Sequence, residues 1–198
     1  MTLKSKVKKL FIKIKYPLKN LPPLKKTSPT HTLPINSAWK GLELIIEDIL
    51  NRFDIKRDSC IEFGVEFGFS TVVFSNYFQE VIGIDTFQGD KHTKQKGDHY
   101  EETKKSLAKY LNIKLFKSDY KDWIKQDVEQ YDLAHVDIIH NYKETYECGL
   151  WAAQHSKCCI FHDTESFPEV RKAVFDIAKN TGKKAYNYPY HNGLGIIV

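Results

Sequence analysis

Five predicted strands each contain or lead into an acidic residue, and these acids are the groups in the sequence best suited to chemistry. They are Glu62, Asp85, Asp119, Asp137 and Asp163. If the strands are parallel, their carboxyl ends lie along one edge of a sheet, where α/β folds bind ligands. Carboxylates gathered there would accept hydrogen bonds from hydroxyl and amino groups and attract a cation. The sequence therefore predicts one acidic binding site assembled from distant parts of the chain.

The first of these strands leads into a turn with two glycines, Gly64 and Gly68. Glycine adopts positive φ and lets the backbone approach a ligand closely, so both glycines are predicted ligand contacts. A dinucleotide-binding turn instead has three glycines and holds a pyrophosphate. This turn lacks the third glycine, and Glu66 would repel a phosphate. Ser70 and Thr71 are then expected to cap a helix.

The acids that follow match the groups of one cationic ligand. Asp85 lies 21 residues past Gly64, a spacing suited to a carboxylate that accepts hydrogen bonds from both hydroxyls of a ribose. Asp119 is placed to accept from the exocyclic amine of an adenine, and acids near the glycine turn favour a sulfonium. S-adenosylmethionine combines these groups. The predicted contacts are Glu62, Gly64, Gly68, Ser70, Asp85, Asp119 and Asp137.

Strand-like and helix-like segments alternate along the chain. Apolar runs predict strands at 60–63, 81–84, 113–116, 133–136 and 158–161, and helices are expected at 39–53, 71–78, 100–110, 120–128, 142–155 and 167–179. This alternation is typical of an α/β fold in which helices flank a parallel sheet. A short turn containing Pro189 and Gly193 separates 184–188 from 194–198, so the last strand is expected to run antiparallel to its predecessor.

Four ordered stretches resemble the class I S-adenosylmethionine-dependent methyltransferases. They are EFGVEFGFS at 62–70, IDTFQGDKH at 84–92, HVDIIHNY at 135–142 and FHDT at 161–164. Within that family they are most similar to a small bacterial branch that includes the macrolide-sugar O-methyltransferases. The resemblance covers residues 58–198 and implies a Rossmann-like three-layer sandwich with a seven-stranded, mostly parallel sheet and an antiparallel last strand. It also implies methylation of a hydroxyl on a sugar or another small acceptor.

The chain departs from this family at two places. Ile138 stands where the family has a glycine after the acid of the fourth strand, which puts the shape of the acceptor pocket in question. Ser156, Lys157 and Cys158 replace a Pro-Gly-Gly turn before the fifth strand.

A sugar hydroxyl is a weak acid, so its methylation needs a group that removes or loosens the proton. His140, beside Asp137 in the sequence, is the predicted catalytic base. Metal-dependent relatives in the same branch imply a second route, in which Asp137 and Asp163 hold Mg²⁺. The two routes are compatible, and both place Asp137 in the catalytic machinery.

Structural roles remain open for the same residues. His140 could cap the helix predicted to begin near Tyr142, and Asp163 could cap the helix before Phe167. His162 could be a buried histidine at the end of a strand.

The N-terminus is strongly basic, although the formal net charge of the whole chain is only +5. Residues 1–42 contain ten lysines and no acid, so they carry +10, and the remaining 20 basic and 25 acidic residues carry −5. Residues 1–16 place apolar residues at helical spacing among lysines, a pattern that could lie on an anionic membrane surface. A solvated tail or a helix on a partner subunit is the alternative. Residues 17–35, with five prolines, are expected to form a linker, which gives a tail at 1–35 and a catalytic domain at 36–198.

The composition is that of a globular protein, with 41% hydrophobic residues and no apolar run as long as a membrane span. Four cysteines without metal-site spacing indicate reduced thiols in the cytoplasm. An NAD-dependent oxidoreductase is an alternative that the missing third glycine disfavours. An RNA-directed methyltransferase that uses the basic tail is another, and the acidic body argues against a nucleic acid partner.

Overall fold

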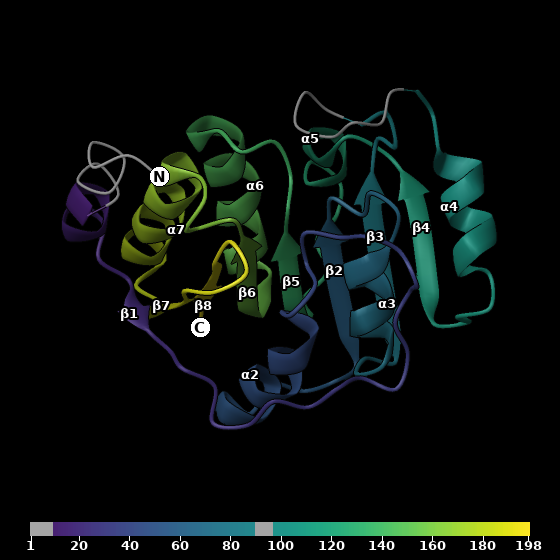
Figure 1. The fold of residues 1–198 in the computed structure, drawn as a ribbon. Coiled ribbons are helices and arrows are strands. Elements are labelled where there is room, and N and C mark those ends of the chain that lie inside the picture. Colours follow the sequence, from purple (N-terminus) through teal and green to yellow (C-terminus); the bar gives the residue numbers. More distant parts are fainter. Residues whose placement is uncertain (1–9, 90–96) are drawn as a thin grey trace.

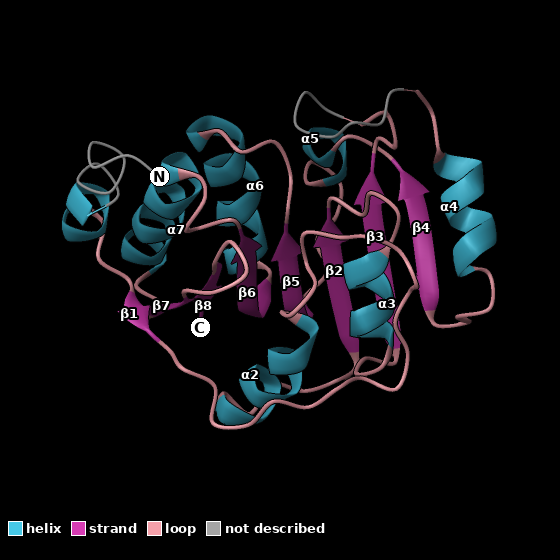
Figure 2. Ribbon diagram, viewed as in Figure 1, coloured by secondary structure: helices cyan, strands magenta, loops and turns pink. Residues whose placement is uncertain are grey.

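The computed structural model contains a single eight-stranded sheet with helices on both faces (Figures 1 and 2). It describes residues 10–89 and 97–198. The strands are β1 (Lys19–Asn20), β2 (Ser59–Phe63), β3 (Glu80–Asp85), β4 (Ile113–Lys117), β5 (Tyr131–Val136), β6 (Ser156–His162), β7 (Ala185–Tyr188) and β8 (Leu194–Ile197). The helices are the 3₁₀ helix η1 (Glu43–Ile45), α2 (Ile46–Arg52), α3 (Phe69–Ser75), α4 (Tyr100–Leu107), α5 (Tyr120–Trp123), α6 (Tyr142–Gln154) and α7 (Pro168–Thr181).

The strands lie in the order β1-β7-β8-β6-β5-β2-β3-β4. β2 to β6 pair in parallel, and β8 runs antiparallel to both β6 and β7, so the predicted reversal of the last strand is confirmed. The prediction of seven strands is one short. β1 is the additional strand, and it pairs with Tyr186 and Asn187 of β7. A strand of two residues inside a proline-rich segment has no hydrophobic pattern that could reveal it.

The core lies on both faces of the sheet. Cys60 of β2 packs with α2, α3 and α4 in one apolar cluster, whereas Ile61 and Phe63 pack with α6 and α7 in the other. Successive side chains of a strand point to opposite faces, so a central strand must be apolar on both. All three side chains are fully buried. The parallel strands therefore end at an edge whose position is fixed by packing from two sides.

The helices expected at 39–53 and 120–128 are much shorter in the structure. The segment from Trp39 begins with turns because Gly41 adopts φ +99°, a left-handed conformation that interrupts a helix. After α5, the Asp127 carboxylate accepts hydrogen bonds from Trp123 Nε1 and the Tyr131 hydroxyl. Asp127 also accepts from the backbone N–H of Glu129 at 3.0 Å, and because a side-chain bond to the backbone competes with the helical pattern, residues 124–128 do not continue α5.

The N-terminal segment follows the body of the protein. Residues 10–15 are helical, and residues 17–35 run along the domain in a largely extended form (Figure 1). Leu18 and Leu33 are buried, and the Leu21 N–H donates to the carbonyl of Asn187. Within residues 10–89 and 97–198, no helix has the length and apolar character needed to cross a bilayer.

Replacing Gly64 with alanine tests how tightly the first strand and its neighbour are packed. Gly64 has φ +94°, and a Cβ there would lie 1.9 Å from the carbonyl oxygen of Asp137. We expect Gly64→Ala to lower the free energy of unfolding by 2 kcal/mol or more, on the order of the cost of a backbone clash plus left-handed strain. Denaturant unfolding measures this.

Gly182→Ala is the matched control, because Gly182 has φ +71° and no heavy atom within 4 Å of an added Cβ. It should cost only the left-handed strain, about 1 kcal/mol. Equal losses for the two variants would contradict the close packing of Gly64.

Candidate functional site

A cavity of about 820 Å³ opens at the edge of the sheet where the parallel strands end. The turns after β2, β3, β4, β5 and β6 all contribute to its wall, so four of the five acids predicted to converge, namely Asp85, Asp119, Asp137 and Asp163, meet at this edge. Of the predicted site residues, those that line it are Gly64, Ser70, Asp85, Asp119, Asp137, His140 and Asp163. The cavity therefore has an acidic wall assembled from residues up to a hundred positions apart.

Glu62 and Gly68, which the sequence predicted as ligand contacts, do not line the cavity. The Glu62 side chain is 0% exposed. Its carboxylate accepts from the hydroxyls of Ser70 and Thr71, each at 2.5 Å, and lies 2.9 Å from His135 Nδ1. Glu62 therefore joins β2 to α3 and β5 beneath the cavity.

The cap of α3 also differs from the prediction. Gly68, at φ +84°, is the N-cap, whereas Ser70 and Thr71 lie inside the helix and direct their hydroxyls to Glu62. A Cβ on Gly68 would meet the Leu107 side chain rather than a ligand. The sequence shows two hydroxyl residues after a glycine. The same pattern occurs where a hydroxyl caps a helix and where it donates to a buried carboxylate, so it does not distinguish the two roles.

Asp85 fixes the glycine turn while lining the cavity. Its carboxylate accepts from the backbone N–H groups of Val65 at 2.8 Å, Glu66 at 2.9 Å and Phe87 at 2.7 Å. A carboxylate offers about four acceptor positions, so these three bonds leave it capacity for a ligand hydroxyl. The end of β3 and the turn after β2 are consequently held together by one side chain.

Asp119 lines the cavity next to Ser118 and Tyr120. It is also the N-cap of α5, because its Oδ1 accepts from the Lys121 N–H at 2.8 Å. The short helix thus positions the Asp119 carboxylate, which was predicted from the sequence to accept a hydrogen bond from an adenine amine.

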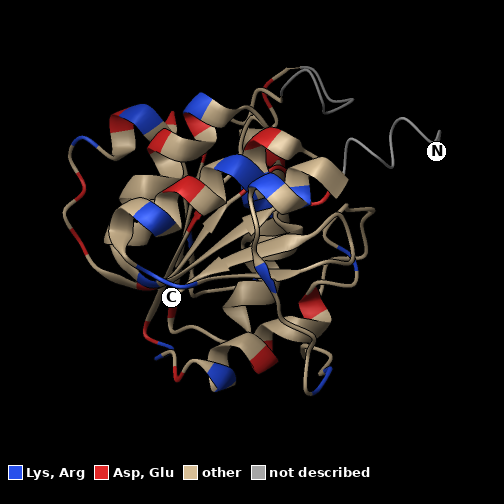
Figure 3. Cartoon of the chain, turned by 90° about the vertical axis from the view of Figure 1, so that its left-hand side faces the viewer, with Lys and Arg blue, Asp and Glu red and all other residues tan. Residues whose placement is uncertain are grey.

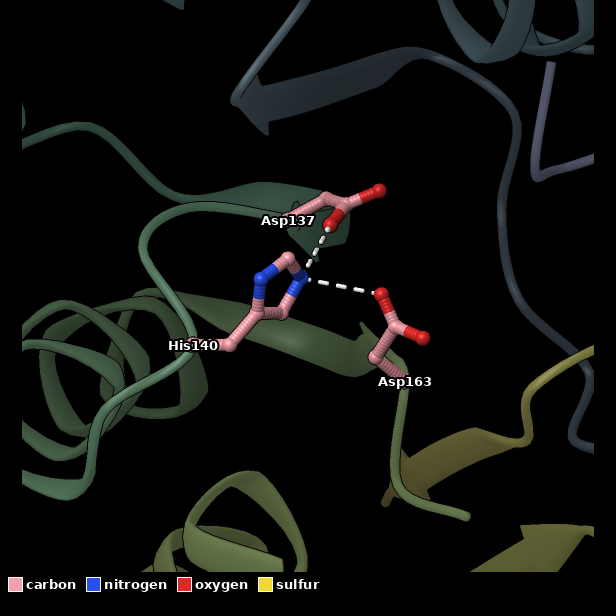
Figure 4. A group of neighbouring side chains, drawn as sticks. All are labelled: Asp137, His140 and Asp163. Carbon is pink, nitrogen blue, oxygen red and sulfur yellow. Dashed lines mark ion pairs between the residues drawn. The ribbon is translucent and has the colours of Figure 1, made fainter. Parts of the chain in front are cut away.

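Two aspartates and two histidines form a cluster on the opposite wall. His140 Nε2 lies 2.9 Å from Asp163 Oδ2 and 3.5 Å from Asp137 Oδ1, as Figure 4 shows. His162 Nδ1 lies 3.0 Å from Asp137 Oδ2 on the other side of that carboxylate. The His140 ring stacks on Phe167, with ring centroids 4.1 Å apart. The imidazole is therefore held between two carboxylates and against an aromatic ring.

The capping roles left open by the sequence are not the ones observed. Asn141 caps α6, because its side chain accepts from the Glu144 N–H at 3.0 Å. The N-cap of α7 is Phe167, not Asp163. Asp163 instead has φ +68°, an unusual conformation for a residue with a side chain and one often associated with functional sites. The strand-end interpretation of His162 fits its burial, with a side chain only 2% exposed.

Charge in the cluster shifts the pKa of Asp137, His140 and His162. For Asp137, burial opposes ionisation, but the charge of His162 and hydrogen bonds from His140 and His162 outweigh it and hold the pKa below its ordinary value. For His140, burial would lower the pKa, but hydrogen bonds to Asp137 and Asp163 raise it to about 10. The pKa of His162 is raised as well, against burial, mainly by Asp137. At neutral pH, Asp137 is therefore a carboxylate and His140 carries a proton.

The same cluster has the donors of a metal site. Asp137, His140 and Asp163 each offer one ligand atom, and these atoms lie within 4.8 Å of one another. Two carboxylates suit hard cations such as Mg²⁺, and an imidazole suits first-row transition metals. The residues present therefore fit a divalent ion.

Several residues of the wall were not predicted from the sequence. Residues 35–39 line the cavity, although they were expected to be the end of a linker and the start of a helix. Trp39 lies edge-on to the buried His135, with ring centroids 5.0 Å apart. A tryptophan just after a proline-rich stretch was the one cue that this segment packs on the domain.

Comparisons with known proteins agree with this geometry. A family model described as a methyltransferase domain matches residues 61–164. Among solved structures, the O-methyltransferase NovP has 14% identity and a TM-score of 0.63, covering 80% of this chain and 77% of NovP. The O-methyltransferase TomG from Streptomyces achromogenes has 13% identity and a TM-score of 0.55, covering 75% and 76%. Aeropyrum pernix fibrillarin, with bound S-adenosyl-L-methionine, has 12% identity and a TM-score of 0.51, covering 73% and 68%.

No curated protein matches the chain significantly. At identities of 12–14% the solved structures show a shared fold, whereas the family model matches more than half of the chain. The chain therefore belongs to the methyltransferase-domain family, and it is a class I S-adenosylmethionine-dependent methyltransferase.

Proposed function

We propose that this protein transfers a methyl group from S-adenosylmethionine to a hydroxyl of a sugar or another small acceptor. The observation that carries the proposal is the position of His140 between Asp137 and Asp163 on the wall of the cavity. A hydroxyl acceptor needs a group that takes or loosens its proton, and this cluster offers both an imidazole and a set of metal ligands. NovP and TomG, which share the fold, are O-methyltransferases.

The glycine-turn side of the cavity suits the methyl donor. Gly64 lets the backbone come close to the ligand, Asp85 accepts a hydrogen bond from a ribose hydroxyl, and Asp119 accepts from the adenine amine. S-adenosylmethionine supplies a methyl group bound to a positively charged sulfur, so the reaction is an in-line displacement for which alignment matters most. The carboxylate of Asp137, between the two ends of the cavity, favours that positive charge. All four residues line the one cavity, which supports this assignment.

The acid–histidine cluster suits the acceptor. His140 Nε2 is the atom that would take the proton of the hydroxyl. Its pKa of about 10 means that at neutral pH it already holds a proton, because both carboxylates stabilise the cation. His140 can act as a base only when the pull of Asp137 and Asp163 is weakened.

A bound metal ion would connect the two routes predicted from the sequence, which are a histidine base and a metal held by two aspartates. Mg²⁺ held by Asp137 and Asp163 would neutralise both carboxylates and acidify a nearby hydroxyl. The pKa of His140 would then fall toward its ordinary value of 6.5, and the imidazole would become able to accept a proton. In this proposal Asp137 and Asp163 hold the ion and position the acceptor, while His140 removes the proton.

The alternatives have weaker support. The family match disfavours an NAD-dependent oxidoreductase. Methanococcus jannaschii fibrillarin, another solved structure with this fold, is described as a pre-rRNA processing protein and so bears on an RNA substrate, but Asp85, Asp119, Asp137 and Asp163 around the cavity would repel a phosphate backbone.

Replacing His140 separates its chemical role from a structural one. We expect His140→Gln to lower kcat by about a hundredfold or more, the usual contribution of a general base, because glutamine cannot take up the proton. Affinity for S-adenosylhomocysteine should stay within about twofold, since His140 contacts the acceptor in this proposal. Methyl transfer to a panel of glycosides and calorimetric titration with S-adenosylhomocysteine measure the two quantities.

His155→Gln is the matched control, because His155 is stacked on Trp151 at the end of α6 and does not line the cavity. It should leave both quantities unchanged. Full activity of His140→Gln would rule out the imidazole as the base.

Metal binding should release protons. Because the pKa of metal-free His140 is about 10, the ring is protonated at pH 7.5, and an ion on Asp137 and Asp163 should displace up to one proton from it. Mg²⁺ affinity should therefore rise as the pH increases toward 10. Calorimetric titration with Mg²⁺ in buffers of different ionisation enthalpy counts the protons released.

Asp163→Asn should abolish both Mg²⁺ binding and the proton release, whereas Asp176→Asn, on α7 outside the cavity, should keep both. Mg²⁺ binding unaffected by Asp163→Asn would place the ion elsewhere.

A further inference from the structure

The helical residues 10–15 expose three large apolar side chains. Leu10 is 60% exposed, Phe11 64% and Ile14 70%. These side chains lie on one face of the helix, because positions 10 and 14 are one turn apart and position 11 is three before 14. We call Leu10, Phe11 and Ile14 the apolar stripe.

The surroundings of the apolar stripe are basic. At 100° per residue, Lys13 and Lys15 fall on either side of it. Ile12 and Tyr16 fall on the opposite side and are only partly exposed. The helix thus presents the apolar stripe with a lysine on each margin, of which Lys13 is also paired with Glu165 of the domain.

Contacts with the domain hold the apolar stripe outward. Arg171 Nε donates to the carbonyl of Tyr16 at 3.0 Å, and the Tyr16 ring packs on Phe175 of α7. Lys13 Nζ forms an ion pair at 2.6 Å with Glu165, which precedes α7. Figure 1 shows the helix outside α7, and Figure 3 views the chain from that side. The side opposite the apolar stripe faces the domain, so the stripe itself is on the surface.

We propose that the apolar stripe and its flanking lysines dock the protein on an anionic lipid bilayer. A helix of this kind lies in the plane of the membrane, with its apolar side chains among the acyl chains and its lysines at the headgroups. Lysine ammonium groups beside an anionic surface add attraction, and residues 1–42 carry +10 with no acidic residue. Residues 1–9, which belong to the basic pattern in the sequence, lie outside the described part of the chain.

Charge and apolarity together favour this partner over others. An RNA would use the lysines, but its phosphates gain nothing from exposed leucine, phenylalanine and isoleucine side chains. A second copy of the chain would cover the apolar stripe but would bring two segments of charge +10 together. An anionic bilayer satisfies both the apolar and the basic groups.

The test is flotation of the full chain with vesicles. The chain should float with vesicles of phosphatidylcholine and phosphatidylglycerol and stay behind with phosphatidylcholine alone. Added salt should weaken the binding by screening the lysines. The double variant Phe11→Ser/Ile14→Ser should bind at least about tenfold more weakly, because two side chains no longer enter the acyl region.

Leu111→Ser/Val128→Ser is the matched control, because these residues are 94% and 79% exposed on other parts of the surface. It should bind as the native chain does. All variants should keep the native melting temperature, since the replaced side chains are exposed.

Three results would overturn the proposal. They are equal binding by the Phe11→Ser/Ile14→Ser variant, equal binding to neutral vesicles, and failure of the full chain to float. If the chain fails to float but binds polyuridine, or forms dimers that Phe11→Ser disrupts, the basic segment serves RNA or self-association instead.

Discussion

The close contact between Gly64 and the backbone of Asp137 determines how the site is assembled. A Cβ at position 64 would lie 1.9 Å from the Asp137 carbonyl oxygen, so only glycine lets the turn after β2 lie this close to the end of β5. The turn side of the cavity carries Asp85 and Asp119, and the β5 side carries the acid–histidine cluster. A methyl donor and an acceptor can share one cavity because these two sides meet.

Polar groups that are buried or partly buried hold this arrangement in place. Beneath the cavity, Glu62 links α3 to β5 through hydrogen bonds. Asp85 accepts hydrogen bonds from three backbone N–H groups of the neighbouring turns. Buried polar atoms are costly without partners, so such networks fix one geometry when every partner is present. The cluster of Asp137, His140 and Asp163 is different, because two carboxylates share one imidazole. In the proposed mechanism a cation bound to the two carboxylates would change the charge around His140 and so allow it to accept a proton.

The sequence predicted the order of the elements and the edge at which the acids meet. The order of the elements follows from hydrophobic periodicity, which is a local rule. The common edge follows from the geometry of parallel strands, which is a general rule. It misplaced Glu62, because a carboxylate inside a strand can point to the cavity or beneath it, and only the partners Ser70, Thr71 and His135 decide between these. It also missed β1 and the wall at 35–39, since irregular segments take their path from tertiary contacts. The protonation of His140 depends on two carboxylates that folding brings next to it, so no local sequence pattern could predict it.

The most direct test of the central claim is the response of backbone amides to the methyl donor. Adding S-adenosylmethionine to ¹⁵N-labelled protein should produce saturable shifts that are largest at Gly64, Val65 and Glu66, whose turn Asp85 fixes, with further shifts near Asp137. NAD should produce none at these positions. Shifts confined to other parts of the chain, or equal shifts with NAD, would contradict the account.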